Sequence, residues 1–190
     1  MAKTGERKAQ ILQTLAAMLE NPKGERITTA LLAARLDVSE AALYRHFASK
    51  AQMFEGLIEF IEQTVFTLVN KIQVEEKDAM KQIESTVATL LGFAQKNPGM
   101  TRVLIGDALV NEDERLQARM NQFIDRLEAS LRQSARLALT AGTLPADWDV
   151  NAYANAVIAF VIGRWHQYAK SGFKREPMDG WAQQWRVFAA

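Results

Sequence analysis

The chain has 190 residues, 48% of them hydrophobic, enough to bury a substantial core in one domain or in a small head joined to a larger body. Its formal net charge is only +1, so bulk charge gives no argument for a nucleic-acid partner, and the absence of cysteine excludes disulfides and thiolate metal sites. No apolar run approaches the roughly 18 residues of a membrane span, and the first residues lack the pattern of a secretion signal, so we expect a cytoplasmic protein.

Apolar residues recur at helical spacing through almost the whole chain, without the alternation typical of strands and without an Asn-Gly or Asp-Gly hairpin signal. This pattern predicts an all-α fold. The first predicted helix carries an apolar stripe from Ile11 to Leu19 and ends at the helix-breaking run Asn21-Pro22-Lys23-Gly24.

Two short helices joined by a tight turn are predicted next. Thr28 or Thr29 can cap a helix that runs through Leu36, and Ser39 can cap another that runs to about Phe47. Only two residues separate these helices, which is the arrangement of a helix-turn-helix.

The two faces of this motif differ in composition. The residues predicted to form its core are Leu31, Ala34, Leu36, Val38, Leu43 and Phe47. The residues predicted for its outer face are Ser39, Ala41, Ala42, Tyr44, Arg45 and His46. Asp37 stands where such turns often have glycine, and aspartate accepts the left-handed conformation better than most residues. The third helix fits the roughly 12 Å wide major groove of DNA and is the predicted reading helix.

A long helix is predicted to start near Ser49 or Lys50. Its apolar residues at helical spacing are Met53, Phe54, Leu57, Ile58, Ile61, Val65, Leu68 and Ile72. Phe60 lies beside this stripe and is either a partly buried core residue or an open one. The next helix runs over about 78–96 and ends at Asn97-Pro98-Gly99, because proline lacks a donor and glycine permits a left-handed turn.

The C-terminal half is predicted to be helical as well. A short helix at 100–109 precedes a long polar helix over about 111–140, which residues 142–145 break. Asp147 can cap an apolar helix that ends near Tyr168. An apolar stripe of Trp181, Trp185 and Phe188 predicts a terminal helix. The four tryptophans could line a pocket or fill a core, and they are Trp148, Trp165, Trp181 and Trp185.

Small residues repeat at helical spacing along the helix that follows Asp147, at Ala152, Ala156, Ala159 and Gly163. Such residues let two helix backbones approach closely. We therefore expect the helices over about 111–140 and 147–170 to pair with those of a second copy in a four-helix interface.

No constellation of catalytic or metal-binding residues stands out. The two histidines, His46 and His166, lie 120 residues apart, and no cluster of Asp, Glu and His has metal-ligand spacing. No glycine-rich phosphate loop, nucleophile elbow or pair of catalytic carboxylates occurs. We therefore expect neither an enzyme nor a bound metal or cofactor.

The segment from Ser39 to Lys50, with its Leu-Tyr-x-His-Phe-x-x-Lys pattern, resembles the recognition helix of the TetR family. The resemblance implies a helix-turn-helix DNA-binding domain at 1–50 and a helical dimerisation and partner-binding domain at 51–190. It implies phosphate contacts at Thr29, Ser39, Tyr44, His46 and Lys50, and base contacts by the exposed early positions of the third helix. The candidate DNA-binding residues are Thr28, Thr29, Ser39, Ala41, Ala42, Tyr44, Arg45, His46 and Lys50.

A group of nucleoid occlusion factors within this family resembles the chain more closely, over residues 27–47, 57–62, 91–93, 97–99 and 115–119. Members of the group bind short palindromes across the chromosome and, while bound, antagonise polymers of the division protein FtsZ. The resemblance implies that the C-terminal tail of FtsZ binds between the fourth and fifth helices, at Phe60, Leu68, Thr89, Gly92 and Lys96. Leu68 and Thr89 stand where that group usually has Arg and Leu.

The function implied is that of a nucleoid-associated homodimer that blocks cell division over the chromosome, with one or more dimers on each DNA site. The alternative is a ligand-responsive repressor of the TetR type, which binds a small molecule between the body helices and then releases DNA. The sequence contains no decisive signal for such a ligand.

Overall fold

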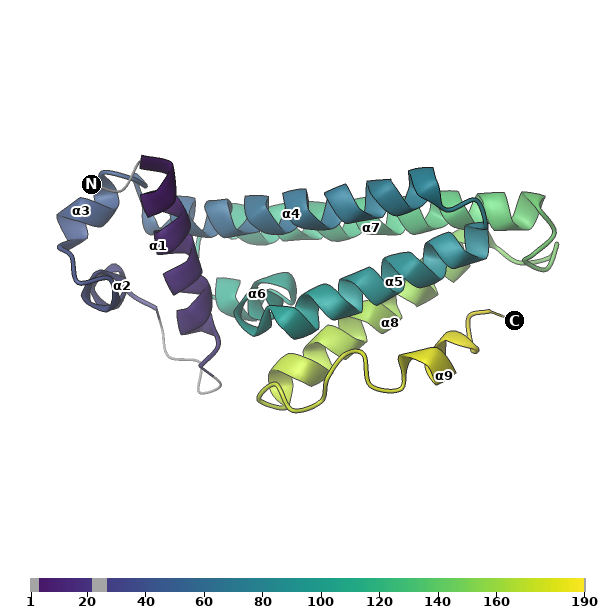
Figure 1. The fold of residues 1–190 in the computed structure, drawn as a ribbon. Coiled ribbons are helices and arrows are strands. Elements are labelled where there is room, and N and C mark those ends of the chain that lie inside the picture. Colours follow the sequence, from purple (N-terminus) through teal and green to yellow (C-terminus); the bar gives the residue numbers. More distant parts are fainter. Residues whose placement is uncertain (1–3, 22–26, 190) are drawn as a thin grey trace.

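The structure is a computed structural model that describes residues 4–21 and 27–189, and over these residues the regular structure is helical, as predicted. Figure 1 shows a small head at one end of an elongated body. The head helices are α1 (Thr4–Leu19), α2 (Thr29–Arg35) and α3 (Glu40–Tyr44). The body elements are α4 (Lys50–Glu75), α5 (Ala79–Lys96), α6 (Pro98–Leu104), the 3-10 helix η1 (Asp107–Leu109), α7 (Glu114–Thr140), α8 (Val150–Lys170) and α9 (Trp181–Trp185). Pro22, Lys23 and Gly24, predicted to end the first helix, lie outside the described residues.

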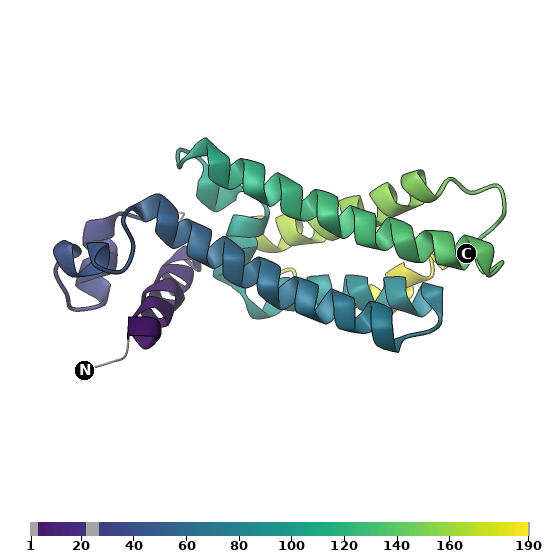
Figure 2. The ribbon, with the colours of Figure 1, turned by 90° about the horizontal axis from the view of Figure 1, so that it is seen from above.

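The long helices of the body pack in two layers. The α4 and α7 helices run side by side along the length of the body, and α5 and α8 lie on one side of them (Figures 1 and 2). Because α5 contacts α4, α6, α7 and α8, it lies at the centre of the body. The last described residues, after α9, lie at the end of the body away from the head.

Tryptophan side chains fill the core of the body. Trp165 of α8 is buried and donates its indole N–H to the carbonyl oxygen of Leu90 in α5 at 3.1 Å. Trp181 and Trp185 are also buried, and their ring centroids lie 5.5 Å apart. Trp148 is only partly buried against this core. Of the two roles left open by the sequence, core packing is therefore the one found for Trp165, Trp181 and Trp185.

The caps and the turn of the helix-turn-helix agree with the prediction. The hydroxyl of Thr28 accepts a backbone N–H of the first turn of α2 at 3.2 Å, and the hydroxyl of Ser39 does the same for α3 at 3.3 Å. Asp37, between the two helices, has a φ of 52°, which is the left-handed conformation expected of it.

The core of the head has a different register from the predicted one. Leu32 and Ala33 of α2 are buried, whereas Leu31 and Ala34, both predicted core residues, are exposed. The other predicted core residues of the motif are buried or partly buried. The error arises because residues 30–34 are all Ala or Leu, so that their pattern does not distinguish the inward face of the helix.

Two helix boundaries also differ from the prediction. The α3 helix ends at Tyr44 rather than near Phe47. The chain tightens into a turn there, in which the N–H of His46 donates to the carbonyl of Leu43 at 2.9 Å. The α8 helix is capped by Asp149 rather than Asp147. The Asp149 carboxylate accepts the backbone N–H groups of residues 152 and 151, which hold its pKa below the ordinary range.

Gly99 does not form the left-handed turn that was predicted for it, since α6 begins at Pro98 and Gly99 lies in its first turn. A Cβ atom on Gly99 would lie 2.0 Å from the carbonyl oxygen of Ala16, so glycine is required for α6 to approach α1 this closely. The guanidinium of Arg102 adds hydrogen bonds to the carbonyls of Leu19 and Asn21 at 3.3 and 3.2 Å. These contacts hold the head against the body.

We expect Gly99→Ala to lower the free energy of unfolding by about 1–3 kcal/mol, because a backbone carbonyl cannot move aside as a flexible side chain can. Urea denaturation followed by circular dichroism measures this loss. Gly5→Ala in α1 is the matched control, because no atom lies within 4 Å of the added Cβ. If the two variants had the same free energy of unfolding, the close contact of α1 with α6 would not contribute to stability.

Candidate DNA-binding face and body groove

The outer face of the head is formed by α3 and the start of α2. Ser39, Ala41, Tyr44 and Arg45 are exposed there, as predicted for the outer face. The remaining candidates on these two helices are exposed or partly exposed, and they are Thr28, Thr29, Ala42 and His46. The predicted reading helix α3 therefore presents small side chains at Ala41 and Ala42 and a tyrosine at its end, with Arg45 directly after it, and such a surface can enter a DNA groove.

Several of these side chains also hold the motif together. The hydroxyls of Thr28 and Ser39 are used as helix caps, so both oxygens already have a backbone partner. The hydroxyl of Thr29 donates to the carboxylate of Glu40 at 2.5 Å and ties α2 to the start of α3. The Nδ1 atom of His46 is buried and has no hydrogen-bond partner within the described residues. The hydroxyls of Thr28, Thr29 and Ser39 are therefore already used within the motif.

Lys50, also a candidate DNA-binding residue, lies apart from this face at the joint between head and body. Its ammonium pairs with the carboxylate of Glu112, which precedes α7, and lies 5.6 Å from the centroid of the Phe54 ring. Both side chains of the pair are mostly buried, with exposed fractions of 22% and 15%. Lys50 is thus held by the body in this structure.

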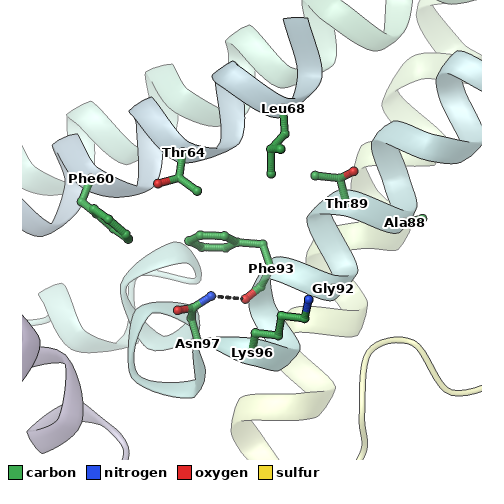
Figure 3. A pocket seen from close by; sticks show the side chains of 9 residues that line it. All are labelled: Phe60, Thr64, Leu68, Ala88, Thr89, Gly92, Phe93, Lys96 and Asn97. Atoms are coloured by element: carbon green, nitrogen blue, oxygen red, sulfur yellow. Dashed lines mark hydrogen bonds between the residues drawn. The ribbon is translucent and has the colours of Figure 1, made fainter. Parts of the chain in front are cut away.

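A groove of about 520 Å³ lies between α4 and α5 (Figure 3). Its lining residues are Phe60, Thr64, Leu68, Ala88, Thr89, Gly92, Phe93, Lys96 and Asn97. All five residues expected to bind the FtsZ tail are among them, although 36 residues separate the first from the last.

The groove has apolar walls and a cation at one end. Phe60 and Leu68 project from α4 with 47% and 41% of their surface exposed, so Phe60 is an open residue, and Leu68 is not the core residue it was predicted to be. Phe66 and Val69 are buried in its place, because the inward face of α4 rotates slightly over its length. Lys96 is exposed at the end of α5.

Four lining residues were not predicted from the sequence. Thr64 lies between Phe60 and Leu68 at a spacing of four, and Ala88 precedes Gly92 by the same interval. The i, i+4 rule applied to the expected residues would have found them. The other two are Phe93, which follows the expected residue Thr89 by the same interval, and Asn97, whose side chain donates to the Phe93 carbonyl at 2.7 Å (Figure 3).

The described part of the chain contains no group of three histidine, cysteine, aspartate or glutamate side chains placed to hold a metal ion. None of the helices described is long and apolar enough to cross a membrane.

Comparison with known proteins identifies relatives over nearly the whole chain. A family model of the SlmA-like type, described as "Tetracyclin repressor-like, C-terminal domain", matches residues 77–190, and one described as "Bacterial regulatory proteins, tetR family" matches residues 23–57. The nucleoid occlusion factor SlmA of Marinomonas sp. is 52% identical over 98% of this chain and 95% of its own length. The nucleoid occlusion factor SlmA of Idiomarina loihiensis is 48% identical over 95% of this chain and 92% of its own length.

Solved structures of regulators share the fold at low sequence identity. The TetR family transcriptional regulator PfmR from Thermus thermophilus superimposes with a TM-score of 0.79 at 19% identity, over 94% of this chain and 96% of that one. The fatty acid degradation regulator FadR from Bacillus halodurans gives a TM-score of 0.80 at 13% identity, over 100% of this chain and 97% of that one. Their similarity to this chain is one of fold.

Gly92 is not required by packing within the chain, because nothing lies within 4 Å of a Cβ placed on it. We therefore expect Gly92→Ala to raise the free energy of unfolding by about 0.5–1 kcal/mol, since glycine in the middle of a helix is less stable than alanine. Thermal and urea denaturation measure the change. A loss of stability would mean that α5 does need glycine here for its own folding.

Proposed function

The chain belongs to the TetR family, with a C-terminal domain of the SlmA-like type, and we propose that it is a nucleoid occlusion factor. In this role it binds palindromic DNA and, while bound, antagonises FtsZ polymers, so that division does not occur over the chromosome. The observation that carries the proposal is the groove between α4 and α5. All five residues expected to bind the FtsZ tail line this groove. The protein then acts by binding, not as an enzyme, and is cytoplasmic and nucleoid-associated.

DNA binding is assigned to the head, residues 1–50. The exposed face of α3 is small at Ala41 and polar at Tyr44 and Arg45, which suits entry into the major groove. Contacts to phosphates by Tyr44 and His46 would fix the head on the duplex without reading its sequence. Removing either side chain should therefore weaken binding to all DNA sequences.

Partner binding is assigned to the body, residues 51–190, and to the groove in particular. An extended apolar peptide would cover Phe60 and Leu68, and a carboxylate near its end could pair with Lys96. Leu68 supplies apolar surface where related proteins usually have a cation, so apolar contact would account for more of the affinity here. Burial of Phe60 could contribute about 1.5–3 kcal/mol.

Dimerisation is assigned to α7 and α8. Ala152, Ala156 and Ala159 are exposed along one face of α8 and Gly163 is partly exposed, so that a second copy could approach the helix backbone closely. Val187, in the segment after α9, lies with Ala152 and Ala156 around a shallow hollow beside this face. Two-fold symmetry would place the two α3 helices on the half-sites of a palindrome.

We expect Phe60→Ala to weaken binding of the FtsZ C-terminal tail by about tenfold or more, in proportion to the apolar surface that is lost, and to leave DNA binding unchanged. Fluorescence anisotropy with a labelled tail peptide and with a palindromic duplex selected from random sequences measures both affinities. His46→Ala is the complementary variant and should lose DNA affinity while retaining the tail peptide.

The control for peptide binding is Phe160→Ala, which removes a partly buried phenylalanine from α8, outside the groove. Cosedimentation with FtsZ polymers, with and without the duplex, extends the test to the assembled filament. If the protein had no measurable affinity for FtsZ or its tail even on DNA, the occlusion function would be wrong. A small molecule that raised the melting temperature and released DNA would then favour the ligand-responsive repressor.

We expect Ala156→Trp to convert the dimer to monomers or aggregates, because a large side chain would separate the two α8 backbones at their closest approach. Sedimentation velocity measures the change, and DNA affinity should fall with it, since a monomer contacts only one half-site. Lys81→Trp, at an exposed position of α5 and so outside the two helices assigned to the interface, serves as the control. An undisturbed Ala156→Trp dimer would place the interface elsewhere.

A further inference from the structure

The joint between head and body contains an ion pair that links segments 62 residues apart. Lys50 is the first residue of α4, and Glu112 lies in the loop between η1 and α7. The ammonium of Lys50 is enclosed on one side by the Glu112 carboxylate and on another by the ring of Phe54. Among the residues that the structure describes, Lys50 is the only cation paired with Glu112.

The neighbouring cation does not offer Glu112 a substitute partner. Arg115 is bound by Glu55 at 3.1 Å and by Asp113 at 3.2 Å. Transfer of the Lys50 ammonium to a DNA phosphate would therefore leave the Glu112 carboxylate mostly buried and unpaired, which is costly. If the ammonium contacted both anions at once, the carboxylate and the phosphate would repel each other at close range.

The loop that carries Glu112 is also held in place. Asn111 has a φ of 67°, a conformation that few residues other than glycine adopt, and the N–H of Glu112 donates to the carbonyl of Leu109 at 3.0 Å. Asp113 caps α7 by accepting the N–H of Arg115 at 3.1 Å. The backbone that carries the Glu112 side chain is therefore fixed beside Lys50.

We propose that Glu112 is a positioning residue that lowers the affinity of the protein for DNA by holding the Lys50 ammonium at the head–body joint. The proposal rests on the DNA-binding part of the proposed function and on the phosphate contact that the TetR resemblance implies for Lys50. In each protomer, the Lys50 ammonium is then only partly available to a DNA phosphate. Because the exchange involves a phosphate and no base, it acts on every DNA sequence alike.

The test measures DNA affinity as a function of salt concentration for the full-length protein and its variants, with a selected palindromic duplex and a scrambled duplex. Glu112→Gln should bind both duplexes more tightly, by roughly threefold or more. The slope of log K against log salt should become more negative by about 0.9 for each protomer, because one further phosphate contact is completed. Glu112→Asp, which keeps the charge, should behave like the wild-type protein.

Lys50→Ala decides whether Glu112 acts through Lys50. In the Lys50→Ala background, Glu112→Gln should have no further effect on affinity or slope. The matched control is Glu62→Gln, which removes the same charge from the partly buried pair with Arg119, about 18 Å further along α4 from the position of Lys50. This variant should bind DNA like the wild-type protein. Circular dichroism checks folding, and Glu112→Ala serves as a second variant if Glu112→Gln does not fold.

The results distinguish a wrong role for Glu112 from a wrong assignment of DNA binding. Unchanged affinity and slope in Glu112→Gln, or an equal gain with and without Lys50, would overturn the role of Glu112 while DNA binding by the head stood. A wild-type protein that bound neither duplex would overturn the proposed function and this inference with it.

Discussion

The close packing of α4 against the head is the contact on which the rest of the molecule depends. A Cβ on Gly56 of α4 would lie 3.1 Å from the side chain of Leu12 in α1 and 3.5 Å from the ring of Phe47, so the helix passes the head with almost no space between them. Phe60, one turn further along, already lines the groove. One continuous helix thus joins the reading head to the body groove, and the orientation of one constrains the other.

Features that depend on local chemistry were predictable from the sequence. Thr28, Ser39 and Asp78 cap the helices they were expected to begin, and Asp37 adopts the left-handed turn expected of it. The inward face of α2 was not predictable, since a run of Ala and Leu is apolar all round and the neighbours of the helix select the buried side. The role of Gly99 was hidden for a similar reason, because its partner is a backbone carbonyl of α1 that no pattern near residue 99 reveals.

The candidate site also contains features that the sequence predicted and one that it could not. The five groove residues were expected from resemblance, and the helical spacing of four accounts for Thr64 and Ala88 beside them. The pairing of Lys50 with Glu112 was not accessible, because it joins the start of α4 to an irregular loop whose path depends on α6 and η1. The motif indicated a lysine for DNA, and only the fold brings it against a carboxylate.

The groove and the core are opposite faces of one helix. The inner face of α5 is buried against the body, and its Leu90 carbonyl receives the indole N–H of Trp165 in α8. The outer face carries Thr89 and Gly92, which open into the groove. The other wall of the groove is held in the same way, because the inner face of α4 is buried in the core as well, so both walls are fixed from behind.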